Sequence, residues 1–129
     1  MMDTKKSPLS PHLQIYRWHI SSLLSISHRI VGVLNIFAIT LICFWIIFLS
    51  GGEISYEKIK LFLQTFFGKF IVISLCWTFS FHILNELRHL FWDMGYGFNL
   101  NTSRVTGILV IIGSLILAII FYFIGTNFF

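Results

Sequence analysis

The sequence predicts an all-α membrane protein with three transmembrane helices, and composition and patterning both support this fold class. Hydrophobic residues make up 57% of the 129-residue chain and charged residues only 11%. A soluble domain has about 25% charged residues, so this chain has too few polar groups to cover a water-exposed surface. The apolar residues also form three runs, each close to the ~20 residues that cross a bilayer. We therefore expect residues 1–129 to form a single membrane-anchor domain.

The first two expected helices cover residues 22–49 and 69–90. The segment from Ile30 to Leu49 contains no charged residue. At about 1.5 Å per residue it spans roughly 30 Å, the thickness of the hydrocarbon region. The second helix contains His82 in its interior, where an ionisable side chain is costly unless it faces protein or a cofactor.

The third expected helix covers residues 105–127 and carries no charge, while three of its residues are small enough to allow close helix contact: Gly107, Gly113 and Ser114. Residues 1–21 are expected as an N-terminal segment at the inner face of the membrane. Loops are expected at residues 52–60 and 91–104, and the apolar segment from Leu61 to Phe67 is expected to approach the membrane through its interface.

Basic residues predict the orientation of the chain. The N-terminal segment and the loop at residues 91–104 share one side, which holds six of the nine basic residues: Lys5, Lys6, Arg17, Arg29, Arg88 and Arg104. The other side holds Lys58, Lys60 and Lys69. This excess places the N-terminus inside and the C-terminus outside. The same distribution explains the net charge of +4 without nucleic-acid binding, which we do not expect.

Four residues near the start of the first expected helix share one face, because they recur at i, i+3, i+4 and i+7: Ser25, His28, Arg29 and Gly32. Two interpretations are open. The cluster lies among lipid headgroups, with Arg29 reaching the interface. Alternatively it forms a polar pocket in which a hydroxyl and a guanidinium bind a ligand carbonyl oxygen.

A second polar face follows the second expected helix and consists of His82, Glu86, His89 and Asp93. His82 lies about 10 Å deeper than His89. It is either a core histidine hydrogen-bonded to a neighbouring helix or an axial haem ligand, since neutral imidazole binds iron well. His89 is too near on the same helix to reach the opposite haem face, and His28 is expected closer to the surface. A bis-His haem would therefore need a second histidine from another chain.

Three segments in this order resemble the large cytochrome b anchor subunit of succinate dehydrogenase, respiratory complex II. They are SPLSPHLQIYR (Ser7 to Arg17), SISHRIVG (Ser25 to Gly32) and HILNELRHLFWDMGYGF (His82 to Phe98). The combination of SPHLxIYR, SxxHRxxG and HxxxxxRHLxxDxG is specific, whereas each motif alone is weak. The resemblance extends over residues 7–129.

The resemblance implies a subunit of three helices that pairs with a second small anchor subunit and binds one haem b between the two. It also implies docking of the iron–sulfur and flavoprotein subunits on the inner face. By similarity His82 would be the axial ligand from this chain, and the partner would supply the other. The haem propionates would then lie near His28, Arg29 and His89.

The resemblance further implies that Ser25 and Arg29 line a ubiquinone pocket, and that Asp93 lies on a proton path or holds Arg29. The family usually has glycine at the position of Glu86, where glycine permits close approach to the helix. The chain would thus belong to an oxidoreductase complex of electron transport and the tricarboxylic acid cycle. It would contain no catalytic residue of its own.

Two other functions remain open at this stage. One is a fumarate reductase anchor that uses menaquinone and works in the reverse direction. The other is a structural or transporter subunit without a cofactor, in which the polar faces serve helix contacts or an ion path. Both the mitochondrial inner membrane and the bacterial cytoplasmic membrane are compatible with the sequence.

Overall fold

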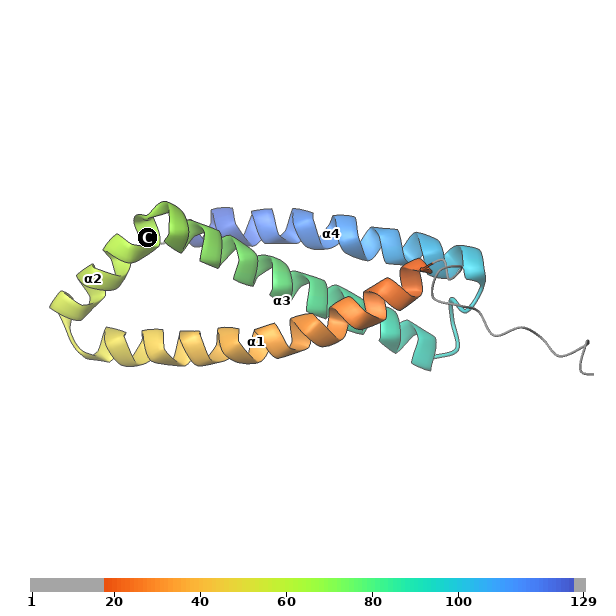
Figure 1. Cartoon of the computed structure of the whole chain (residues 1–129), viewed down its shortest axis with the longest axis horizontal. Coiled ribbons are helices and arrows are strands. Elements are labelled where there is room, and N and C mark those ends of the chain that lie inside the picture. Colours follow the sequence, from red (N-terminus) through yellow and green to blue (C-terminus); the bar gives the residue numbers. More distant parts are fainter. Residues whose placement is uncertain (1–17, 127–129) are drawn as a thin grey trace, which may run out of the picture.

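The computed structural model describes residues 18–126, which form four α-helices and no strand. In chain order these are α1 (Ile20–Ser50), α2 (Glu53–Gln64), α3 (Phe66–Asp93) and α4 (Leu100–Thr126). Helices α1, α3 and α4 are long and lie side by side, and the short α2 joins α1 to α3 at one end (Figure 1).

The three long helices are also the ones with the length and hydropathy needed to cross a membrane. The prediction of an all-α protein with three membrane spans is therefore confirmed for the described residues. The inside and outside assignment of the two termini stays a prediction. Most of the expected N-terminal segment, including the motif from Ser7 to Arg17, lies outside the described residues.

The connection between the first two spans is a helix, whereas the sequence predicts a loop at residues 52–60 and an interfacial segment from Leu61 to Phe67. The loop prediction is wrong because the polar residues of this stretch also suit an exposed helix. The interfacial position of residues 61–67 stays a prediction. Glu53 lies in the first turn of α2, where a carboxylate interacts favourably with the helix dipole. Glu57 and Lys60 are three residues apart on it and can attract each other.

The corner between α2 and α3 depends on Thr65 and Gly68. Thr65 is extended, and its hydroxyl oxygen accepts a hydrogen bond from the backbone N–H of Gly68 at 3.1 Å, which caps α3. A Cβ on Gly68 would overlap the carbonyl oxygen of Phe62 and lie 2.8 Å from the Cα of Leu63. The chain can therefore turn this tightly only with glycine at that position.

The second connection is shorter than the loop expected at residues 91–104. Helix α3 continues to Asp93 and α4 already begins at Leu100. Gly95 and Gly97 follow the end of α3 with φ angles of 87° and 85°, a conformation that glycine adopts without strain. These two glycines end the helix and return the chain toward α4.

The core of the bundle lies between α1, α3 and α4 and is built around Leu24, Val31, Phe81 and Val110. Gly107 allows α1 and α4 to approach, because a Cβ there would lie 2.7 Å from Leu24 Cδ1. Ser114 is fully buried. The prediction that small residues of the third span permit close helix contact is confirmed.

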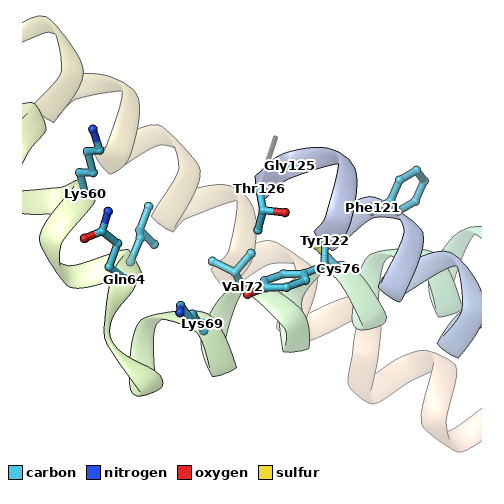
Figure 2. A pocket seen from close by; sticks show the side chains of 10 residues that line it. Lys60, Gln64, Lys69, Val72, Cys76, Phe121, Tyr122, Gly125 and Thr126 are labelled. Carbon is cyan, nitrogen blue, oxygen red and sulfur yellow. The ribbon is translucent and has the colours of Figure 1, made fainter. Parts of the chain in front are cut away.

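Toward its C-terminal end, α1 diverges from the other two long helices (Figure 1). Every residue from Ile39 to Ser50 except Trp45 is exposed. This leaves a long apolar surface for lipid or another membrane subunit. At the same end, a cavity of about 320 Å³ lies between α2, α3 and α4, with Lys60, Lys69 and Tyr122 on its wall (Figure 2). None of the predicted site residues lines this cavity.

Candidate functional site

Two histidines from different helices meet at the interface between α1 and α3. The rings of His28 and His82 are stacked, with centroids 4.3 Å apart and planes inclined by 11°. Gly32, one turn beyond His28, also faces His82, because a Cβ there would lie 3.5 Å from His82 Cε1, an ordinary van der Waals contact. His82 therefore points at α1 and away from the lipid side of α3.

The stacking corrects the expectation that His28 lies closer to the membrane surface than His82. Helix α1 begins at Ile20, so His28 is already about two turns inside it. Helices α1 and α3 run in opposite directions (Figure 1), and the stacked rings place His28 at the same level along the bundle as His82. The two rings present their faces to each other, so they cannot hold a haem between them in this arrangement.

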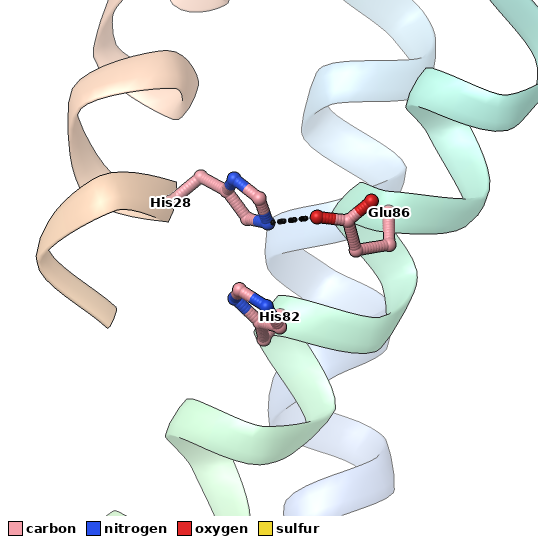
Figure 3. A group of neighbouring side chains, drawn as sticks. All are labelled: His28, His82 and Glu86. Atoms are coloured by element: carbon pink, nitrogen blue, oxygen red, sulfur yellow. Dashed lines mark ion pairs between the residues drawn. The ribbon is translucent and has the colours of Figure 1, made fainter. Parts of the chain in front are cut away.

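Glu86 completes the cluster one turn after His82. Its Oε1 lies 3.0 Å from Nε2 of His28, which is ion-pair distance (Figure 3). Nε2 of His28 forms no hydrogen bond within the described residues, so its contact with Glu86 is electrostatic. The side chain of His28 is 17% exposed and that of Glu86 is 57% exposed, so the pair lies at the edge of the helix interface.

The three side chains have a composition that can hold a metal ion or a metal-containing cofactor. One ligand atom from each of His28, His82 and Glu86 lies within 4.8 Å of the other two. The Nδ1 atom of His82 is buried and has no hydrogen-bond partner within residues 18–126. Imidazole nitrogens without a protein partner are the ligands that iron and zinc accept.

His89 extends the cluster toward the end of α3 that bears Asp93. Its ring centroid lies 5.6 Å from that of His28, and its ring meets Trp92 edge-on at 5.3 Å. The structure thus brings together four of the polar residues singled out in the sequence, which are His82, Glu86 and His89 on α3 and His28 on the facing α1. Polar residues from both predicted faces meet at one interface.

The remaining predicted site residues lie around this cluster without joining it. Ser25 is half-buried on α1, whereas Arg29 is exposed beside His28. Asp93 is exposed at the last residue of α3. Within residues 18–126, no ion pair connects Arg29 to Asp93.

A polar network that the sequence analysis did not identify lies on the opposite side of α3. Arg88 is only 5% exposed and donates hydrogen bonds to Thr106, Ser103 and Ser21. Its guanidinium carbon also lies 4.0 Å from the ring centroid of Trp92. The only sequence signal for this network is the spacing of Ser103 and Thr106, which are three residues apart and therefore share one face of a helix.

Asn85 is a second polar residue that the sequence analysis missed. It is fully buried between the three long helices, and neither atom of its side-chain amide has a hydrogen-bond partner within the described part of the chain. Its position three residues after His82 gave no sign of this burial, because it belongs to neither predicted polar face.

Comparisons with known proteins agree with the geometry. A profile of the family described as succinate dehydrogenase/fumarate reductase transmembrane subunit matches residues 3–121. The chain is 38% identical over 117 residues to the succinate dehydrogenase cytochrome b556 subunit of Rickettsia felis, covering 91% of each chain.

More distant relatives give the same result. The chain is 33% identical to the succinate dehydrogenase cytochrome b556 subunit of Paracoccus denitrificans over 88% of this chain and 87% of that protein. It is 34% identical to the succinate dehydrogenase cytochrome b560 subunit of Marchantia polymorpha, over 88% and 86% respectively. With three spans, matched relatives over most of its length and an interhelical histidine cluster, the chain belongs to the family of succinate dehydrogenase/fumarate reductase transmembrane subunits.

Proposed function

We propose that this chain is the haem b-binding membrane anchor of a succinate:ubiquinone oxidoreductase, in which it forms part of the quinone-reduction site. The observation that carries the proposal is the placement of His82, whose imidazole faces α1 and has an unpartnered buried nitrogen. The names of the relatives in Rickettsia felis and Paracoccus denitrificans, both cytochrome subunits of succinate dehydrogenase, support this direction over fumarate reduction.

The residues present fit a haem in composition. A neutral imidazole is a good iron ligand, and Nδ1 of His82 has no hydrogen-bond partner in the described residues that would have to be displaced. A haem would supply one-electron redox chemistry at this position. His82 would bind the iron, while His28, His89 and Arg29 would provide hydrogen bonds or positive charge to the propionates.

The second axial ligand would come from a second small anchor subunit. This is supported by the face-to-face stacking of His28 on His82, which leaves no room for His28 to serve from the opposite side. It is also supported by the apolar surface that α1 exposes beyond Ala38, which a neighbouring membrane subunit would cover. The iron–sulfur and flavoprotein subunits would dock at the end of the bundle where α1 begins.

Ser25 and Arg29 would bind the quinone. They lie one turn apart on α1, and the exposed guanidinium of Arg29 forms no ion pair within residues 18–126. A hydroxyl and a guanidinium can hydrogen-bond a quinone carbonyl oxygen, and the guanidinium stabilises negative charge that develops on it. Asp93, exposed at the end of α3, would pass protons to the site or orient Arg29.

The test is an absorbance spectrum of the complete complex purified with its partner subunits. We expect a b-type haem spectrum in the wild type and its loss or alteration in His82→Ala. His19→Ala, which removes an exposed histidine at the start of α1, should leave the spectrum unchanged. A colourless wild-type complex that still reduces ubiquinone would favour the cofactor-free structural role instead.

The quinone site has a separate test. Ser25→Ala and Arg29→Ala should raise the KM for ubiquinone or lower the rate of its reduction, while succinate oxidation with a soluble electron acceptor stays normal. Unchanged quinone kinetics in both variants would remove these two residues from the site. Replacing ubiquinone by menaquinone in the same assay distinguishes the reverse-direction alternative.

A further inference from the structure

We propose that Glu86 is a positioning residue that lowers the reduction potential of the haem, because its carboxylate holds His28 against His82 and places a negative charge beside the ligating imidazole. This inference rests on the proposed function. It goes beyond that function by assigning a role to the one acidic side chain of the histidine cluster.

The first step is geometric. Glu86 lies four residues after His82 on α3, so the two side chains emerge from the same face of that helix. Its side chain is 57% exposed, but Oε1 reaches across to α1 and lies 3.0 Å from Nε2 of His28 (Figure 3). His28 in turn stacks on His82. Glu86 therefore fixes the ring that covers one face of the ligating imidazole.

The second step is electrostatic. Ferric haem carries one more positive charge than ferrous haem, so a nearby carboxylate stabilises the ferric form and lowers the potential. A Glu86 oxygen lies within 4.8 Å of a ring nitrogen of His82. Iron bound to that imidazole would lie near the carboxylate, and charges near a protein surface interact with an effective dielectric constant well below that of water.

The third step concerns the other charges near the cluster. The guanidinium of Arg88 is directed at α4 and Trp92, where Ser103 and Thr106 accept its hydrogen bonds. Arg29 is exposed on α1 and is not paired with Glu86. As long as His28 keeps its charge state, removal of the carboxylate subtracts one negative charge from the haem environment, which fixes the sign of the effect.

The experiment is a spectroscopic redox titration of haem in the complete complex. Glu86→Gln keeps the size and shape of the side chain and removes its charge, so we expect an upward shift of the midpoint potential with the haem retained. Glu86→Asp keeps the charge and withdraws it by one methylene, so we expect a smaller upward shift. Glu57→Gln makes the same substitution at an exposed carboxylate on α2, outside the cluster, so it is the matched control and should leave the potential unchanged.

The outcomes separate this inference from the function on which it rests. A haem-loaded Glu86→Gln complex with the wild-type potential would overturn it. If that variant fails to assemble, a Glu86→Asp complex with a potential equal to or below that of the wild type would do the same. A wild-type complex without any haem spectrum would overturn the proposed function itself. The shift is measured on the haem and not on turnover, so a purely structural role of Glu86 would not produce it.

Discussion

Replacement of Arg88 by methionine should cost the bundle about 3 kcal/mol of stability, because this side chain connects all three membrane-spanning helices. Its Nε donates to Thr106 Oγ1 at 3.2 Å, and its Nη2 donates to the carbonyl and hydroxyl oxygens of Ser103, both at 3.1 Å. A longer hydrogen bond of 3.4 Å reaches Ser21 on α1. Methionine keeps an unbranched apolar stem, though a shorter one, and removes every donor.

The magnitude follows from these contacts. Hydrogen bonds between membrane helices contribute about 0.6 kcal/mol each on average. A desolvated cation over a tryptophan face, as at 4.0 Å from Trp92, adds up to about 2 kcal/mol. Leaving these acceptors without Arg88 costs little additional free energy. Ser21 and Ser103 are hydrogen-bonded to each other at 2.8 Å, and Thr106 donates to the Ser103 carbonyl at 3.2 Å. The methionine variant no longer has to bury the positive charge of Arg88, which offsets part of the loss.

The assay is reversible unfolding of the purified complex in mixed micelles with increasing denaturing detergent. A loss of about 3 kcal/mol is roughly two powers of ten in the folded-to-unfolded ratio. Arg104→Met makes the same substitution at an exposed position near the start of α4 and should change stability by less than about 0.5 kcal/mol. If Arg88→Met is as stable as the wild type or more stable, the buried guanidinium is a net cost and the reasoning is refuted.

Two further predictions use the same unfolding assay. Gly107→Ala should lower stability by about 1–3 kcal/mol because its Cβ would meet Leu24 Cδ1 at 2.7 Å and Ile20 Cγ2 at 2.9 Å, whereas Gly125→Ala, with nothing within 4 Å, should not. Equal effects of the two substitutions would contradict the close approach of α1 and α4. Asn85→Leu should raise stability by about 1 kcal/mol, since the buried amide has no partner within the described residues. A loss of stability would reveal a buried water or another partner for that amide.

The long apolar runs were sufficient to predict the three spans, because in lipid a continuous apolar helix is the only way for such a segment to satisfy its backbone. The helical state of α2 was not predictable with the same certainty. A segment this short, with Glu53, Glu57, Lys58 and Lys60 in it, is compatible with both an interfacial helix and a loop. The structure of this segment also depends on its close contact with α3 at Gly68, a tertiary contact that sequence periodicity does not encode.

The composition of the site was also predictable to a limited extent. Helical spacing placed His82, Glu86 and His89 on one face of α3, and all three approach α1 in the structure. The depth of His28 was misjudged because depth was counted from the expected membrane surface, whereas it depends on the axial register of α1 against α3. Register between two helices is a property of their contacts, and a single sequence gives no direct signal of it.

Arg88 provides a physical account of that register. In lipid, apolar side chains gain little by packing on another helix, so purely apolar contacts resist sliding weakly. The contact of Arg88 with Ser21 fixes one point on α1 against one point on α3. From Ser21 to His28 the chain advances about 10 Å along α1, and from Arg88 back to His82 it covers about 9 Å along α3. These nearly equal steps on antiparallel helices bring the two histidines face to face.

A slide of α1 by one turn would put Gly32 where His28 now lies, and Glu86 would lose its partner. The same slide would pull Ser21 away from Arg88, whose hydrogen bonds to Ser103 and Thr106 keep it fixed to α4. The network at Arg88 thus maintains the alignment of the histidine cluster without touching it. Its directional hydrogen bonds would break on a shift that apolar packing would tolerate. Arg88 and His82 therefore depend on one alignment of three helices, even though their side chains lie on different faces of α3.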